Sequence, residues 1–260
     1  METTAAAYRA IAGALQKRKD IVAKQPSVAL ATNYYRANIS KAKTVDAFVN
    51  DYRLFSYAMK AYGLGEMTQS KGLVRKLLTE YPADPKALVN KMTDPRFKAF
   101  AKAFDFAGKG ANATSAPAAT SLAIDKYLQQ TIEEDAGAQN EGVRLALYFK
   151  RQAPTVASAY GVLADKSLLK VVRTVFNIPS QSSAQSIDTQ AAMLKKFVDP
   201  KDFQDPAKLA RLIDRFTAMW DMSNASSSAP ATALSGYFDS PSTIGMDAGM
   251  LLSLQKFQRR

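Results

Sequence analysis

Apolar residues recur at three- and four-residue intervals along almost the whole chain, and this spacing constrains the fold more than any other feature. The clearest example follows Thr44, a suitable helix N-cap, and stops before Gly63, which suits the left-handed position after a helix. Between them, one helix face carries Val45, Phe48, Val49, Tyr52, Phe55, Met59 and Tyr62. We therefore predict an all-α protein, a helical bundle in which each helix buries one face.

Two Asp-Pro pairs, Asp84-Pro85 and Asp94-Pro95, predict helix starts. An aspartate carboxylate accepts backbone N–H bonds at the N-cap, and proline tolerates the first helical position because its missing N–H would be unsatisfied there. Further along, Pro154 predicts a kink in a helix that begins near Val143.

The order of these features recurs within the chain. Tyr62-Gly63-Leu64 corresponds to Tyr160-Gly161-Val162, Val74-Arg75 to Val172-Arg173, and Asp94-Pro95 to Asp199-Pro200. We interpret this order as two diverged copies of a unit of three or four helices, at about 28–106 and 120–221. The alternative is a chance coincidence of helical patterns.

Composition shifts suggest four segments. Residues 1–106 would hold an N-terminal helix and the first repeat, 107–120 a linker without an apolar anchor, and 121–221 the second repeat. Residues 222–260 would be a mobile tail, because 222–243 are rich in Ser, Ala, Thr and Pro. The tail ends in a short amphipathic helix carrying Leu251, Leu254 and Phe257, which would dock on its own domain or on a partner.

Cysteine and histidine are absent from the chain. Disulfides, cysteine or histidine nucleophiles, histidine bases and the usual zinc or iron–sulfur ligand sets are therefore excluded. The sequence also has no phosphate-binding loop and no nucleophile-elbow motif. We expect no catalytic residues, no cofactor and no metal, and hence a protein that is not an enzyme. An enzyme acting through carboxylates alone remains a lesser alternative.

The formal charge is +12, and residues 1–107 hold 18 basic and 9 acidic side chains. Such a half attracts nucleic acid or another anionic partner, although scattered basic residues also suit a solvated surface. Tyr34, Tyr35 and Arg36 place aromatic rings beside basic groups, as single-stranded nucleic-acid binding requires.

Targeting signals are not evident. Met1-Glu2-Thr3 is acidic, and no apolar core of a secretory signal peptide follows it. No stretch is apolar enough over sufficient length to span a bilayer. We therefore expect a cytoplasmic protein, or one exported by a signal-free route such as the flagellar channel.

Several segments resemble a bacterial domain-of-unknown-function family whose genes often lie in flagellar clusters of motile alphaproteobacteria. They include Gln25-Pro26-Ser27-Val28, Asp51-Tyr52-Arg53-Leu54-Phe55, Met59-Lys60-Ala61-Tyr62-Gly63-Leu64 and Asn90-Lys91-Met92-Thr93-Asp94-Pro95-Arg96-Phe97. The second copy departs from the pattern, with Ala153 in place of Phe55 and Ala157 in place of Met59.

The resemblance implies a helical, flagellum-related protein, with no catalytic residues to carry over. We expect a flagellum-associated structural or accessory protein that acts through protein–protein contacts. The alternative is a cytoplasmic basic helical module that binds nucleic acid or another anion. Candidate interaction residues are Tyr34, Tyr35, Arg36, Arg53, Lys60, Leu251, Leu254 and Phe257.

Overall fold

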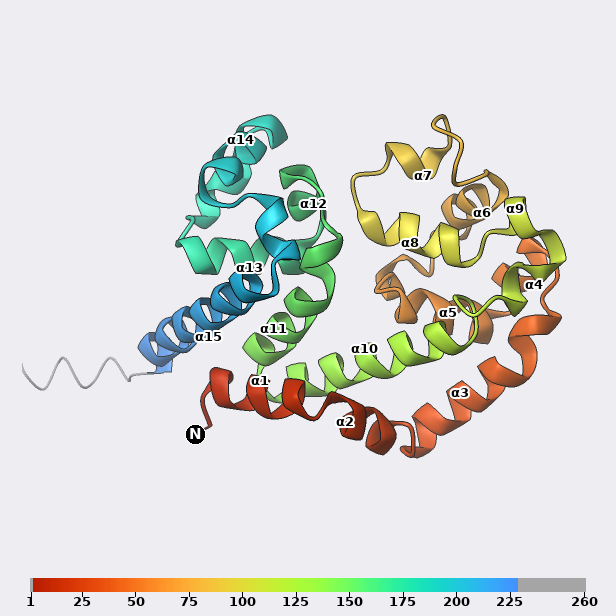
Figure 1. The fold of residues 1–260 in the computed structure, drawn as a ribbon, viewed down its shortest axis with the longest axis horizontal. Helices are drawn as coiled ribbons and strands as arrows, with labels where there is room; N and C mark the ends of the chain where they lie inside the picture. The colour runs from red at the N-terminus through yellow and green to blue at the C-terminus, as the bar shows by residue number, and fades with distance from the viewer. Residues whose placement is uncertain (1, 229–260) are drawn as a thin grey trace, which may run out of the picture. The chain divides into compact units, whose positions relative to one another are not determined.

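A computed structural model describes residues 2–228, which are helical and contain no β-strand (Figure 1). The all-α prediction is confirmed. The chain divides into the units Met1–Asp221 and Met222–Arg260. Of the predicted tail, residues 222–228 continue helix α15, and residues 229–260, with Leu251, Leu254 and Phe257, lie outside the described part.

Three helices open the chain: α1 (Thr4–Gly13), α2 (Leu15–Val22) and α3 (Pro26–Asn38). The Thr3 side chain caps α1 by accepting a bond from the Ala6 N–H. At the other end of the same unit, the Asp221 carboxylate accepts the Thr4 N–H at 3.0 Å. An anion at a helix N-terminus is stabilising, so Asp221 ties α1 to the last helix of the unit.

The first half of the unit, residues 26–120, contains α4 (Val45–Asn50), α5 (Tyr52–Ala61), α6 (Lys71–Thr79), α7 (Leu88–Lys91), α8 (Pro95–Ala103) and α9 (Phe106–Lys109), with 3-10 turns η1 (Ile39–Lys41), η2 (Gly65–Met67) and η3 (Gly110–Ser115). Its core is aromatic: Phe48, Phe55, Phe100 and Phe104 are fully buried. Phe48 and Phe104 stack with ring centroids 4.8 Å apart. Offset aromatic pairs add to the free energy gained by burial.

The long helix predicted between Thr44 and Gly63 is two helices. Asp51 adopts an extended conformation between α4 and α5, and its carboxylate caps α5 by accepting the Leu54 N–H. Most of the stripe is buried as predicted, but Tyr52 is 56% exposed. The predicted continuity of the helix is also wrong, because aspartate favours a cap over a helix interior. Gly63 has φ +73°, and the N–H of Leu64 donates to the Met59 carbonyl at 2.8 Å, which confirms the predicted glycine C-cap.

The two Asp-Pro pairs behave differently. Asp94 caps α8 as predicted, accepting the Arg96 N–H at 2.9 Å. Asp84-Pro85 instead forms a turn, and α7 begins later, at Leu88. The reason is local: the Asn90 side chain donates to the carbonyls of Pro82 and Asp84, which holds the turn in place of a helix.

Segment 107–120 differs from the expected linker. It contains the end of α9 and the turn η3, and Ala113, Thr114 and Ala119 are fully buried. The Tyr35 hydroxyl donates to the Ala119 carbonyl at 2.6 Å. The segment is therefore anchored on the first core by small side chains and backbone carbonyls.

The second half, residues 121–221, holds α10 (Ser121–Gln139), α11 (Glu141–Gln152), α12 (Ala159–Ala164), α13 (Lys166–Phe176), α14 (Ile187–Phe197) and most of α15 (Pro206–Ser228), with turns η4 (Ala153–Thr155), η5 (Ser180–Ala184) and η6 (Pro200–Gln204). Phe149, Phe203 and Phe216 are fully buried in its core. At Pro154 the chain leaves α11 for η4, so the predicted kinked helix ends there.

Helix α10 contacts both halves. Along Figure 1 it runs beside α2 and α5 and leads into α11, and contacts with all three are present. Its Tyr127 ring stacks on Tyr57 of α5 with centroids 3.8 Å apart, and Ile132 packs with Val22 and Val28. The two halves therefore share one long helix.

Residues that correspond in the two predicted copies agree in some places of the structure and differ in others. Val74 in α6 and its counterpart Val172 in α13 are both buried at corresponding places. Gly63, however, follows a helix with positive φ, whereas Gly161 lies inside α12. The two-copy origin stays a prediction.

No helix within residues 2–228 combines the length and the apolar character that crossing a bilayer requires.

Candidate functional site

A pocket of about 460 Å³ lies between the two halves of the unit. Charged side chains from both halves line it, among them Lys60, Glu66 and Arg96 from the first half and Glu134, Arg144 and Lys166 from the second. Concave sites of this size are the usual places for ligands. We therefore ask whether these charges are free to act on a ligand.

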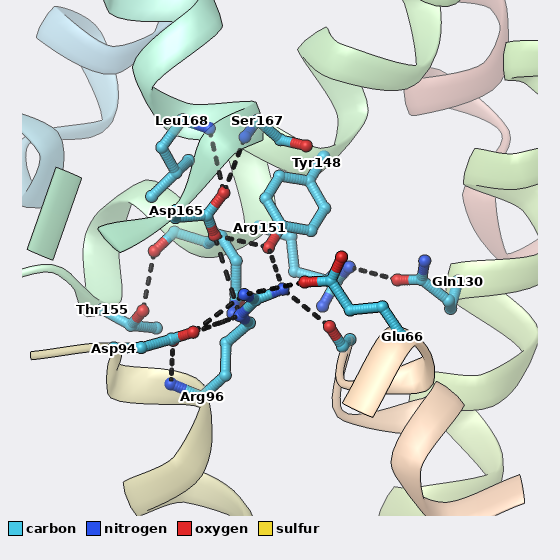
Figure 2. Close-up of polar contacts among 12 residues, drawn as sticks. Glu66, Asp94, Arg96, Gln130, Tyr148, Arg151, Thr155, Asp165, Ser167 and Leu168 are labelled. Carbon is cyan, nitrogen blue, oxygen red and sulfur yellow. Dashed lines mark hydrogen bonds and ion pairs between the residues drawn. The ribbon is translucent and has the colours of Figure 1, made fainter. Parts of the chain in front are cut away.

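Arg96, in the first turn of α8, is the centre of the site (Figure 2). Its guanidinium binds the Asp94 carboxylate, with Nε 3.0 Å and Nη2 2.8 Å from Oδ2. Its Nη1 donates to the Gly63 carbonyl at 2.7 Å. The Asp-Pro-Arg run thus caps α8 and, through the same aspartate, orients the arginine toward the second half.

The second half contributes Asp165 and Tyr148. Asp165 caps α13 through the N–H groups of Ser167 and Leu168, and its Oδ2 accepts the Tyr148 hydroxyl at 2.6 Å. That Oδ2 lies 3.9 Å from Arg96 Nε, and Arg96 Nη1 donates to the Tyr148 hydroxyl at 3.4 Å (Figure 2). Arg96 therefore bridges α8 to α11 and to the α12–α13 junction; we call Asp94, Arg96, Tyr148 and Asp165 the Arg96 clasp.

The electrostatics of the clasp follow from burial and pairing. Burial alone lowers the pKa of Arg96, but hydrogen bonds to Asp94 and nearby negative charge outweigh it and hold this pKa above its ordinary value. Burial, then the Asp165 charge, raises the pKa of Tyr148. At neutral pH Arg96 is thus a cation and Tyr148 a neutral donor.

A second buried pair lies behind the clasp. Arg151 Nη2 lies 2.7 Å from Glu133 Oε2, and the glutamate side chain is 2 % exposed. The same Arg151 nitrogen donates to the Gln130 side chain at 2.8 Å. This pair joins α10 to α11, and the Arg151 guanidinium also lies over the ring of Tyr148 in the clasp, 5.2 Å from its centroid.

Toward the pocket mouth, Lys60 pairs with Glu134 at 2.6 Å and Arg144 with Glu141 at 2.6 Å. Within residues 2–228, Lys166 of this pocket has no acidic partner. The described residues also contain no cluster of three or more acidic side chains placed to hold a metal ion. Chemically, the arrangement holds two halves together through mutual charge pairing.

The structure brings two predicted interaction residues together. Arg53 lies over the Tyr34 ring at 3.6 Å, and the Tyr34 hydroxyl donates to Asp51 at 2.8 Å. Arg36 is exposed beside a shallow pocket near the start of α10, and Lys60 lines the pocket between the halves.

Tyr35 is a correction to the expected interaction set. It is 0 % exposed and stacks on Tyr57 with centroids 4.2 Å apart. Its hydroxyl can be buried because the Ala119 carbonyl accepts its proton. Leu251, Leu254 and Phe257 lie outside the described residues.

Sequence reasoning missed Arg96, Tyr148 and Asp165. Arg96 stood in the quoted Asp94-Pro95-Arg96 run, where only the cap was evident. Asp165 before Lys166 indicates a helix start in the same way, but nothing local to either segment links the two caps. The link depends on contacts between residues about 70 positions apart, 96 and 165.

The chain is similar to a described protein family and to a protein of known structure. A model of the family described as "Protein of unknown function (DUF1217)" matches residues 61–209, more than half of the chain. The chain is also similar to a protein from Agrobacterium tumefaciens known from an X-ray crystal structure, with 47% identity and a TM-score of 0.78, covering 85% of this chain and 94% of that one. No curated protein matches it.

Proposed function

The chain belongs to the DUF1217 family, and from this premise we propose that it is a non-enzymatic, flagellum-associated structural or accessory protein that acts through protein–protein contacts. The observation that carries the non-enzymatic part is the pairing of charges in the pocket between the two halves. Arg96, Lys60 and Arg144 are each engaged with an acidic side chain of the same chain.

The flagellar part rests on the resemblance of segments such as 51–55 and 90–97 to a family encoded in flagellar clusters.

The test is deletion of the gene in a motile bacterium that encodes the chain, followed by swimming assays and electron microscopy of flagella. We expect impaired swimming or missing flagella, restored by the wild-type gene. Normal swimming with normal flagella would rule out the flagellar role.

A complementation variant tests the non-enzymatic part separately. Glu66→Gln with Lys166→Ala removes two exposed charges of the pocket and keeps all four residues of the Arg96 clasp; it also removes the exposed Glu66 carboxylate that lies 3.8 Å from Arg96 Nη2. We expect full rescue by this variant. Failure to rescue, with normal abundance and thermal stability, would show that the pocket acts on a ligand.

The alternative, a module that binds nucleic acid or another anion, is favoured by one observation. Lys17 and Arg18 are exposed on α2 and form no ion pair within residues 2–228. Filter binding of an oligonucleotide at low and high salt decides between them, because true phosphate contacts weaken steeply with salt. We place the protein in the cytoplasm or on the flagellar export route, which fractionation of motile cells tests.

A further inference from the structure

A second hollow, which shares no lining residue with the pocket at the Arg96 clasp, lies between the 80–87 loop and α8. Its volume is about 440 Å³. One side is formed by Tyr81, Pro82, Ala83 and Pro85, and the other by Lys98 and Lys102. We call this hollow the Tyr81 groove.

The apolar side of the groove is preformed. The Asn90 amide donates to the carbonyls of Pro82 at 2.9 Å and Asp84 at 2.8 Å, and the Glu80 carboxylate accepts the Leu88 N–H. The loop therefore keeps its shape without a ligand. A preformed site loses little conformational entropy on binding. Tyr81 is 53% exposed within it.

The basic side of the groove carries unpaired charge. Lys98 and Lys102 are one helical turn apart on α8, and both are exposed. Neither forms an ion pair in the described part of the chain. Like charges at this spacing repel each other, so a negative partner relieves a repulsion that the free protein retains.

Carboxylates also lie near these lysines. Asp105 lines the groove and accepts the Gly108 N–H at 2.9 Å, and Asp84 accepts the Lys86 N–H at 2.8 Å, but among the described residues neither carboxylate is within ion-pair distance of Lys98 or Lys102. The groove thus joins an apolar wall to a wall with two lysines and one aspartate, whose net charge is positive.

We propose that the Tyr81 groove binds an acidic peptide segment of another protein, with an apolar side chain against Tyr81 and the prolines and carboxylates on Lys98 and Lys102. Charge complementarity selects this occupant. Residues 222–260 of the chain carry three basic and two acidic side chains, so its own tail does not complement two lysines. The proline and alanine side chains offer an aliphatic side chain a surface, whereas the Tyr81 ring could also stack on a base, so oligonucleotide binding is one outcome of the test.

This inference rests on the proposed function only in taking the chain to act by protein contact, and it supplies the chemistry of the partner. Its test is a binding measurement on the purified full chain, independent of motility. A failure of binding leaves the deletion phenotype untouched, and a missing phenotype leaves the binding result untouched.

The probe is a fluorescein-labelled peptide of sequence Glu-Glu-Leu-Glu-Glu, followed by fluorescence anisotropy at low salt. Two matched peptides replace every glutamate by glutamine, or the leucine by glycine. We expect saturable binding of the first peptide and about tenfold weaker binding of each matched peptide.

Charge reversal then locates the site. Lys98→Glu with Lys102→Glu should weaken binding of the acidic peptide by about tenfold or more. The matched control, Lys17→Glu with Lys24→Glu, makes the same change in net charge at exposed positions elsewhere and should leave binding within about twofold. Lys98→Gln with Lys102→Gln gives an intermediate loss and serves if the reversed chain fails to fold.

Three results would overturn the proposal. One is absence of saturable binding by the full chain. Another is equal weakening by the control pair, which would indicate attraction to net charge alone. The third is loss of oligonucleotide binding on reversal of Lys98 and Lys102 while peptide binding is unchanged, which would assign the groove to nucleic acid.

Discussion

Replacing Arg96 with alanine removes the one cation that the two halves share in the clasp. The Arg96 side chain is 11% exposed, and those of Asp94 and Asp165 are 11% and 4% exposed. Arg96→Ala therefore leaves two buried carboxylates without their cation. Breaking a buried ion pair by deleting one partner costs about 3–5 kcal/mol.

The structure places the expected loss near the lower end of that range. Asp94 keeps one backbone N–H bond, and Asp165 keeps two backbone bonds and the Tyr148 hydroxyl. We expect the free energy of unfolding to fall by about 3 kcal/mol. For a chain of this size, that loss lowers Tm by about 6–12 °C.

The assay is urea unfolding at neutral pH, followed by circular dichroism and by fluorescence of Trp220, the single tryptophan of the chain. Arg9→Ala is the matched control, because Arg9 pairs with Asp214 on the surface, where their side chains are 66% and 54% exposed. Surface pairs contribute about 0–1 kcal/mol. Arg96→Lys keeps the positive charge but loses the planar guanidinium that donates several hydrogen bonds, so its free energy of unfolding should lie between those of wild type and Arg96→Ala.

The reasoning would be refuted by a loss for Arg96→Ala equal to that for Arg9→Ala. It would also be refuted by a large loss that Arg96→Met reverses in full. In that case volume, and not the shared cation, would be what the clasp requires.

Three further predictions concern other parts of the unit. Gly142→Ala should lower stability by about 1–3 kcal/mol and shift the emission of Trp220, because a Cβ there overlaps the indole ring; unchanged emission and stability would contradict this packing. Gly63→Ala should lower the free energy of unfolding by about 1 kcal/mol because of the glycine's φ of +73°; steric overlap is not the cause, since an added Cβ would lie 3.5 Å from the nearest atom of Arg96. Thermal unfolding measures this loss, and a stabilised variant would show that the turn is not left-handed. Burial raises the pKa of Tyr148 and raises that of Tyr62 to about 12, so both hydroxyls stay protonated in the folded chain but ionise near pH 10 in the unfolded chain. The free energy of unfolding should therefore hold below about pH 10 and fall above it by about 1.4 kcal/mol per pH unit for each tyrosine. Full tyrosinate absorbance of the folded chain at about pH 11 would contradict the burial of these two side chains.

The helices themselves were predictable because their cause is local. The stripe through Phe48 and Phe55 and the cap at Asp94 depend on residues within a turn or two of one another. Two predictions of helices were wrong because side chains compete locally for backbone groups. Asp51 interrupts the apolar stripe by capping a new helix, and Asn90 turns an apparent helix start at Asp84 into a loop. A pattern of apolar residues does not register such side-chain bonds to the backbone.

The candidate site was beyond local reasoning. A buried alanine, such as Ala119, leaves no periodic signal, and the burial of Tyr35 depends on that alanine's carbonyl. Arg96 and Asp165 each look like ordinary residues of a helix start, and only the folded chain brings them within 3.9 Å. Both failures have one physical reason, contacts between segments far apart in the sequence.

The sharing of α10 between both cores bears on how such a protein is assembled and inherited. Tyr127 and Ile132 pack against residues of helices that come much earlier in the chain. A fragment beginning at Ser121 would expose these side chains to water, so neither portion would be an autonomous module. Recombination that exchanged one of the two portions would therefore also have to supply a helix that matches α10. During synthesis on the ribosome, the early helices would lack a packing partner until α10 had emerged.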